Sequence, residues 1–199
     1  MEDRKRISID RIIQVLSSRE RRVIDHPPNY ARAAVLVPLF QKDGSCHLLL
    51  TKRTDLVKYH KGEISFPGGM VDEKDASLEK TALREAYEEI GLREEDVQIL
   101  GTLDDILTVT QFIVTPFVGL FPYPYPFRTS AIEIAELIEV PLSFLLKKEN
   151  LTEQEITRMG RREIVPAYQY GPHTIWGATA RILKQFLDLI STAEKEGVS

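Results

Sequence analysis

Residues 66–92 read FPGGMVDEKDASLEKTALREAYEEIGL, and this stretch decides the fold that we expect and the place where we look for chemistry. A tight Pro-Gly-Gly turn leads into a helix, for which Asp75 is a good N-cap and Gly91 a good C-terminal stop. Apolar residues recur every four positions from Leu78 to Ile90, and this spacing predicts a buried stripe along the helix.

Three carboxylates of the predicted helix fall on one face. Glu85, Glu88 and Glu89 are spaced i, i+3 and i+4, so they lie on adjacent turns and repel one another. A hard divalent cation relieves such repulsion, and Mg²⁺ prefers a few carboxylate oxygens together with substrate phosphates. A solvated acidic face is the plain alternative, and the surrounding residues must decide between the two.

The segment 84–92, REAYEEIGL, resembles the Nudix box, the signature of the Nudix hydrolases. It matches the ending of that box, R-E-apolar-x-E-E-x-G-apolar, at every position. The resemblance implies that this helix binds Mg²⁺ or Mn²⁺ and that the enzyme attacks a phosphoanhydride joining a nucleoside diphosphate to another group. Glu85 and Glu89 are the first candidates for metal ligands, and Glu88 is either a third ligand or the group that orients the attacking water. We expect Arg84 to hold these glutamates by ion pairs.

The loop before the helix departs from the box. Counting back from Arg84, Ala76 stands at the position of the usual loop glutamate and Met70 at that of the usual glycine, as if the loop had gained a residue after Gly69. The loop glutamate is thus missing.

A second motif precedes the box. The run LLTKRT at 49–54, then Lys58, Gly62 and FPGG at 66–69, resembles the accessory motif of the coenzyme A pyrophosphatase subfamily, with Thr54 and Lys58 in place of a smaller residue and Arg. It implies hydrolysis of coenzyme A to adenosine 3′,5′-bisphosphate and 4′-phosphopantetheine. The residues that we expect to bind substrate are Lys52, Arg53, Lys58, Gly68 and Gly69, although the two glycines are equally suited to a purely structural turn.

Two later glutamates are further candidates. Glu133 and Glu136 fall where many Nudix enzymes supply an extra metal ligand or the catalytic base, and a surface role is the alternative for each.

The remaining patterns predict an α/β (α+β) protein, and the resemblance implies a Nudix fold, an α/β/α sandwich with a mixed sheet between helices. Helices are expected at 7–18, 141–146 and 175–194, and strands at 33–39, 47–51, 97–100, 112–120, 133–140 and 163–171. Asp43-Gly44 predicts a hairpin turn, and Pro116 restricts its strand to an edge or bulge. We divide the chain into an N-terminal helical extension at 1–32, a Nudix domain at 33–190 and a loose tail at 191–199.

Three other segments carry polar or aromatic side chains without a clear motif. The basic run 19–22 is expected to be surface, and Asp104 and Asp105 to be loop residues. The proline-aromatic stretch 121–127 predicts a stiff extended loop. Its rings are suited to stack on an adenine, to line a pantetheine arm or simply to cap the core.

Composition limits the remaining choices. The 199 residues are 43% hydrophobic with a net charge of −4, which disfavours a nonspecific nucleic-acid binder. The single cysteine, Cys46, excludes an internal disulfide, and no stretch resembles a signal peptide or a membrane span. We expect a soluble cytoplasmic protein that acts on a small nucleotide and makes no contact with nucleic acid or membrane, with the oligomeric state open, a homodimer included.

Three functions compete. The first is a metal-dependent coenzyme A or acyl-coenzyme A pyrophosphatase, the second a Nudix pyrophosphatase for ADP-ribose, NADH or another nucleoside diphosphate derivative, and the third a non-catalytic nucleotide-sensing module. Glu89→Gln should abolish turnover in either enzyme and, as an exposed change, shift stability by no more than about 0.5 kcal/mol.

Overall fold

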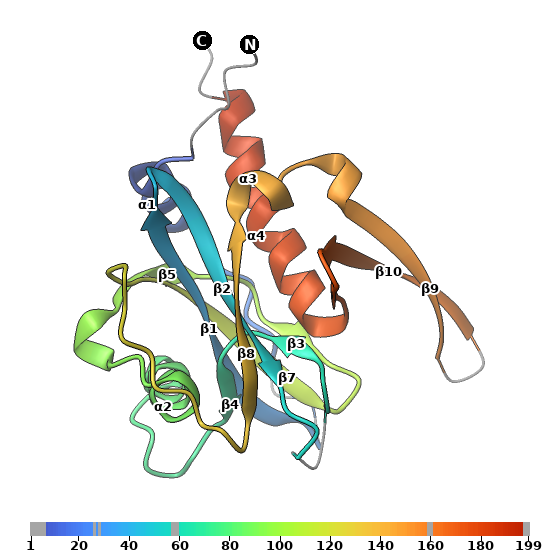
Figure 1. Cartoon of the computed structure of the whole chain (residues 1–199). Helices are drawn as coiled ribbons and strands as arrows, with labels where there is room; N and C mark the ends of the chain where they lie inside the picture. The colour runs from blue at the N-terminus through green and yellow to red at the C-terminus, as the bar shows by residue number, and fades with distance from the viewer. Residues whose placement is uncertain (1–6, 26, 28, 57–59, 159–160, 197–199) are drawn as a thin grey trace.

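The computed structural model describes residues 7–25, 27, 29–56, 60–158 and 161–196 (Figure 1). The helices are α1 (Ile9–Ser17), α2 (Leu78–Ile90), α3 (Leu142–Leu145) and α4 (Gly177–Glu196), with short 3-10 turns at Glu94–Asp96 and Lys148–Asn150. The strands are β1 (Ala31–Lys42), β2 (Ser45–Arg53), β3 (Ile64–Ser65), β4 (Gly68–Met70), β5 (Gln98–Thr102), β6 (Ile106–Leu107), β7 (Phe112–Leu120), β8 (Ile134–Pro141), β9 (Leu151–Arg158), β10 (Arg161–Tyr170) and β11 (His173–Ile175).

The larger sheet is mixed and eight-stranded. Its central order is β3-β2-β1-β7-β5, with β4 on β1, β6 on β7 and β8 on β2. The pair β1 and β7 is parallel, whereas the other pairs are antiparallel. The predicted hairpin is confirmed, because Lys42 pairs with Ser45 across Asp43 and Gly44, which have positive φ of 50° and 70°.

Side chains of β1 alternate between two separate cores. Ala34, Leu36 and Phe40 face α2, while Val37 and Leu39 face the side that carries α1 and α4. Figure 1 shows α2 on one side of the sheet and α4 on the other. The predicted α/β/α sandwich with a mixed sheet is therefore confirmed.

A second sheet of three strands, in the order β11-β10-β9, extends beyond the sandwich (Figure 1). Strand β10 was predicted, but β9 was not, because its sequence LTEQEITR is largely polar. Ile164 of β10 is 69% exposed, so no other described element covers its side chain.

The prediction that Pro116 restricts its strand to an edge or bulge is wrong. Strand β7 lies between β1 and β5 and pairs with β1 along its whole length. On the other side of β7, β6 pairs as far as Val114 and β5 begins to pair at Phe117. Pro116 falls in the gap between them, where its missing N–H costs no ladder hydrogen bond.

Three further expectations need correction. The Pro-Gly-Gly segment is not a tight turn, because the chain bends at Pro67 and then forms β4, in which Gly68 and Gly69 pair with β1. The N-cap of α2 is Ser77 and not Asp75. Helix α4 continues to Glu196, so residues 191–196 of the expected tail are helical, and the rest of the division into extension, domain and tail stays a prediction.

The segment after α1 is tied to the body by two aspartates that were expected to be ordinary loop residues. Asp104 pairs with Arg19 and accepts the Arg22 backbone N–H at 2.8 Å. Asp105 is 5% exposed, accepts the Thr115 hydroxyl at 2.7 Å and the Ile24 backbone N–H at 3.0 Å. Arg19 and Arg22 of the basic run therefore contact Asp104, whereas the whole run was expected to be a solvated surface.

The proline-aromatic stretch caps the core on the α2 side. The rings of Phe121 and Tyr123 lie 5.3 and 4.8 Å from that of Phe40, and Tyr125 and Phe127 pack on Phe121. Among the described residues, no helix is long and apolar enough to cross a membrane.

Candidate active site

Helix α2 carries the three glutamates because its other face is held in the core. Ser77 caps its first turn by accepting the Lys80 backbone N–H at 3.2 Å, and Gly91 ends it with a left-handed φ of 70°. Ala82, Ala86 and Ile90 have no exposed surface. With that stripe buried, Glu85 points towards β4 and Glu89 towards the end of β2, while Glu88 is 57% exposed.

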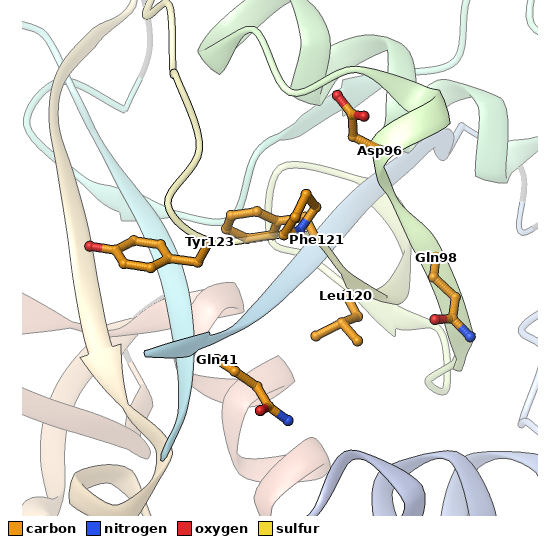
Figure 2. Close-up of a pocket in the computed structure, with 7 residues that line it drawn as sticks. Gln41, Asp96, Gln98, Leu120, Phe121 and Tyr123 are labelled. Carbon is orange, nitrogen blue, oxygen red and sulfur yellow. The ribbon is translucent and has the colours of Figure 1, made fainter. Parts of the chain in front are cut away.

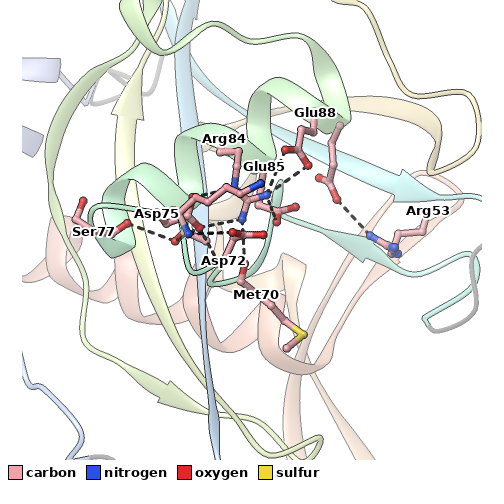
Figure 3. Close-up of polar contacts among 11 residues, drawn as sticks. Arg53, Met70, Asp72, Asp75, Ser77, Arg84, Glu85 and Glu88 are labelled. Atoms are coloured by element: carbon pink, nitrogen blue, oxygen red, sulfur yellow. Dashed lines mark hydrogen bonds and ion pairs between the residues drawn. The ribbon is translucent and has the colours of Figure 1, made fainter.

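Arg84 is the hub of the polar contacts on this face (Figure 3). Its Nη1 donates to Glu85 Oε1 at 2.7 Å and to both oxygens of Glu88 at 3.3 Å. Its Nη2 also donates to the Met70 carbonyl at 3.0 Å, which ties the helix to β4. The expected ion pairs of Arg84 are present.

Asp75 takes the place of the missing loop glutamate. Its carboxylate accepts from Arg84 Nε at 2.9 Å and Nη2 at 3.0 Å, and from the Thr81 hydroxyl at 2.8 Å. The Arg84 guanidinium holds the pKa of Asp75 well below its usual range. Counting back from Arg84 pointed to Ala76. In the longer loop, the preceding residue, Asp75, is the one whose carboxylate contacts the Arg84 guanidinium.

Glu89 is the most buried of the three glutamates. Its side chain is 3% exposed, its Oε1 lies 3.3 Å from Arg53 Nη1, and both Glu89 Oε2 and Arg53 Nε are buried without a hydrogen-bond partner. Burial raises the pKa of Glu89 to about 8, against the opposing charge of Arg53. The premise that Glu89 is exposed was therefore wrong.

The two glycines of β4 leave room for different neighbours, Gly69 for the Glu85 carboxylate and Gly68 for the β1 backbone. A Cβ on Gly69 would lie 2.5–2.6 Å from the Glu85 carboxylate, so the bare backbone forms one wall of the Glu85 site. A Cβ on Gly68 would meet the Ala34 carbonyl and Val35 Cα of β1 at 2.5 and 2.6 Å. Burial raises the pKa of Glu85, while its bond to Arg84 opposes the rise.

Only one of the two later glutamates acts on the cluster. The charge of Glu133 raises the pKa of both Glu85 and Glu89, and its loop is fixed by the hydrogen bond from Ser130 N–H to the Glu89 carbonyl at 2.9 Å. Glu136 lies instead with Oε1 3.3 Å from His173 Nε2.

The structure brings Arg53 but not Lys52 to the cluster. Arg53 Nη1 lies 3.3 Å from Glu89 Oε1, whereas none of the ion pairs among the described residues joins Lys52 to the cluster. Lys58 is outside the described residues, so its expected role is a prediction only.

The donor set fits a hard divalent cation. Carboxylate oxygens are the ligands that Mg²⁺ and Mn²⁺ prefer, and the unpaired Glu89 Oε2 is a buried oxygen in need of a partner. Glu85, Glu88 and Glu89 would hold such a cation. Within the described ranges, no three acidic, His or Cys side chains lie close enough together to bind a metal ion. Arg84 pairs with Glu85 and Glu88, and Arg53 pairs with Glu89.

Comparison with known proteins identifies the family of the chain. A model of the NUDIX domain matches residues 30–135. The chain is 41% identical over 157 residues to a Nudix hydrolase NudL of Enterobacter sp. (strain 638), over 79% of this chain and 81% of that protein. A NudL of Salmonella heidelberg (strain SL476) is 34% identical over 183 residues, over 92% and 95% of the two chains.

Solved structures support the fold. The crystal structure of a NUDIX hydrolase from Alicyclobacillus acidocaldarius has a TM-score of 0.54 at 18% identity, over 80% of this chain and 92% of that one. A MutT/nudix family protein from Enterococcus faecalis has a TM-score of 0.52 at 16% identity, over 93% and 70%. The family model covers more than half of the sequence and the relatives cover most of it, so the chain belongs to the Nudix family of hydrolases.

Proposed function

We propose that this Nudix pyrophosphohydrolase cleaves the phosphoanhydride of coenzyme A or acyl-coenzyme A with Mg²⁺ or Mn²⁺. The products are adenosine 3′,5′-bisphosphate and 4′-phosphopantetheine or its acyl form. The observation that carries the proposal is the junction of two motifs: Arg53, from the coenzyme A-type motif on β2, lies 3.3 Å from Glu89, from the Nudix helix. The FPGG part of the same motif forms the wall beside Glu85.

The chain's own side chains have distinct roles in this reaction. Arg84 orients Glu85 and Glu88 and is itself fixed by Asp75, so the carboxylates are held by one connected set of hydrogen bonds. Arg53 balances the buried charge of Glu89. A divalent cation held by Glu85, Glu88 and Glu89 would neutralise charge on the phosphoryl oxygens and would lower the pKa of an attacking water.

Glu133 is the better candidate for the catalytic base. Its negative charge adds to the rise in the pKa of Glu85 and Glu89 that burial causes, whereas Glu136 is paired with His173. A carboxylate beside the cluster but outside α2 is suited to accept the proton of the attacking water.

A substrate panel with a matched variant tests the proposal. Wild-type protein, Glu89→Gln and the surface control Glu153→Gln are assayed with coenzyme A, ADP-ribose and NADH in Mg²⁺ or Mn²⁺. We expect coenzyme A to be the best substrate and Glu89→Gln to lose more than about 100-fold in kcat, because groups that merely orient a metal ligand already contribute roughly 10–100-fold.

The outcomes separate the alternatives. Faster turnover of ADP-ribose or NADH by wild type, lost in Glu89→Gln, would keep the carboxylate mechanism and reject coenzyme A as substrate. Full activity of Glu89→Gln would reject the assignment of Glu89. No turnover of any substrate would favour a nucleotide-sensing module.

A further inference from the structure

A hollow opens at the C-terminal end of α2, next to the carboxylate cluster. It has a volume of about 500 Å³, within the range of small-molecule sites. Its lining residues, which we call the Tyr87–Arg128 pocket, are Tyr87, Glu88, Gly91, Arg93, Tyr125, Pro126 and Arg128. Glu88 belongs both to this pocket and to the cluster held by Arg84, so the two sites are contiguous.

The pocket offers an aromatic ring that the fold does not use. Tyr87 is 58% exposed although it lies on the same helix as the buried stripe of α2. Tyr125, by contrast, has its hydroxyl bonded to Asp96 Oδ2 at 2.7 Å and its ring packed on Phe127. An exposed ring beside a cavity is suited to stack on a nucleobase.

The pocket also offers a cation that is not needed to end the helix. The last carbonyls of α2 accept backbone N–H groups: Glu89 from Ser130 at 2.9 Å, Ile90 from Arg128 at 3.0 Å and Tyr87 from Gly91 at 2.9 Å. Within the described part of the chain, the Arg128 guanidinium has no acidic partner. Arg93 differs, because Asp96 and Glu95 lie 3.1 and 3.6 Å from it.

The backbone of Arg128 is fixed by close packing. A Cβ on Gly91 would lie 3.0 Å from both the Cβ and the backbone N of Arg128. The end of α2 therefore fixes the Cα and Cβ of Arg128. The residue itself is exposed, so its guanidinium can contact a ligand. A guanidinium in this setting is suited to bind a phosphomonoester.

Another hollow has no basic side chain among the described residues that line it. It has a volume of about 450 Å³ and is lined by Gln41, Asp96, Gln98, Leu120, Phe121, Pro122 and Tyr123 (Figure 2). Its charged lining residue is the carboxylate of Asp96, which opposes an anionic ligand.

We propose that the Tyr87–Arg128 pocket binds the 3′-phosphoadenosine half of the substrate, with the adenine on the Tyr87 ring and the ribose 3′-phosphate at Arg128. This rests on the proposed function, because it assigns a subsite to the nucleotide whose phosphoanhydride lies at the glutamates. It makes the 3′-phosphate, and not only the phosphoanhydride, a determinant of specificity.

Direct binding of two nucleotides tests the pocket without turnover. Adenosine 3′,5′-bisphosphate and adenosine 5′-monophosphate are titrated calorimetrically, with Mg²⁺, into wild type, Arg128→Gln, Arg128→Lys and the exposed-arginine control Arg162→Gln. We expect wild type to bind the bisphosphate at least about 10-fold more tightly, Arg128→Gln to lose this preference and Arg128→Lys to retain part of it. Tyr87→Ala should weaken both nucleotides equally, and Tyr87→Phe neither.

Equal affinity of wild type for the two nucleotides, or an undiminished preference in Arg128→Gln, would overturn the pocket assignment. These results are independent of the substrate panel. A protein that hydrolyses coenzyme A without preferring the bisphosphate keeps its proposed function and loses this subsite. A protein that shows the Arg128-dependent preference but leaves coenzyme A intact keeps the subsite and loses the proposed reaction.

Discussion

Glu89 and Arg53 form a buried pair in which each side chain keeps one polar atom without a hydrogen bond. A buried carboxylate oxygen without a hydrogen-bond donor is a position where a cation can bind. A proton competes with the cation at this position, because burial raises the pKa of Glu89 to about 8.

The burial of Glu89 predicts a pH dependence of stability in chelator-treated protein. Its pKa is about 8 in the folded state against 4.5 for the free side chain, so the folded protein holds a proton that the unfolded chain releases. The contribution of Glu89 to the free energy of unfolding is fully present below about pH 4.5 and is lost as the pH rises towards 8. Urea unfolding across that range should show the free energy of unfolding of wild type falling relative to that of Glu89→Gln.

Added Mg²⁺ supplies the control for this titration. At pH 8 it should raise the stability of wild type and not that of Glu89→Gln, because a ligand that binds only the folded state stabilises it. A difference between the two proteins that stays constant with pH would contradict the buried ionisation of Glu89.

Sequence spacing predicted which glutamates share one face of α2 but not their environments. The i, i+3 and i+4 pattern was sufficient to place Glu85, Glu88 and Glu89 on that face. Glu89 is buried and Glu88 is 57% exposed. This difference depends on β2, which is distant from α2 in sequence, and on β4, which is only three residues long. The role of Asp75 was hidden for the same reason, since a motif count assumes a fixed loop length.

Among the elements, β4 joins α2 to the sheet, and its two glycines are constrained by different neighbours. Gly68→Ala would push a methyl group into the β1 backbone, which cannot yield, so we expect a loss of about 1–3 kcal/mol in the free energy of unfolding. Gly69→Ala meets the flexible end of Glu85, so the carboxylate should shift instead.

Gly69→Ala should therefore lower kcat strongly and stability little, whereas Gly68→Ala should lower stability. Urea unfolding and steady-state kinetics of the two variants distinguish these effects. Equal losses of stability would show that the Glu85 side chain does not yield and that both glycines serve packing alone.

The errors at the element scale have a common cause. Local residue preferences suggested a turn at Gly68-Gly69, a cap at Asp75 and an edge strand at Pro116. In each case a tertiary partner decided otherwise: β1 for the glycines, Arg84 for Asp75 and the gap between β6 and β5 for Pro116. Elements with strong periodicity, such as α2 and β7, were predicted nearly to their ends.

Across the whole molecule, Asp105 connects the segment after α1 to the sheet. Asp105→Ala would leave the Thr115 hydroxyl and the Ile24 N–H without their acceptor, and Arg21, 3.7 Å away, without its partner. We expect a loss of about 2–4 kcal/mol in the free energy of unfolding, with kcat close to wild type because the anchor is separate from the carboxylate cluster. Unchanged stability would show that this anchor contributes nothing net.

The layered architecture was predictable because hydrophobic runs and one strong motif indicate it, whereas the second sheet was not. Strand β9 lies at the edge of the three-stranded sheet in the described part of the chain, and its largely polar sequence lacks the apolar alternation that predicts a half-buried strand.

Product analysis in ¹⁸O-labelled water tests the central claim most directly. Purified protein is incubated with coenzyme A and Mg²⁺ or Mn²⁺, and the products are identified by mass spectrometry. We predict adenosine 3′,5′-bisphosphate and 4′-phosphopantetheine, with one ¹⁸O atom in a phosphate of one of them, because water cleaves the phosphoanhydride. Release of inorganic phosphate with the phosphoanhydride intact, or recovery of unchanged coenzyme A, would contradict the account.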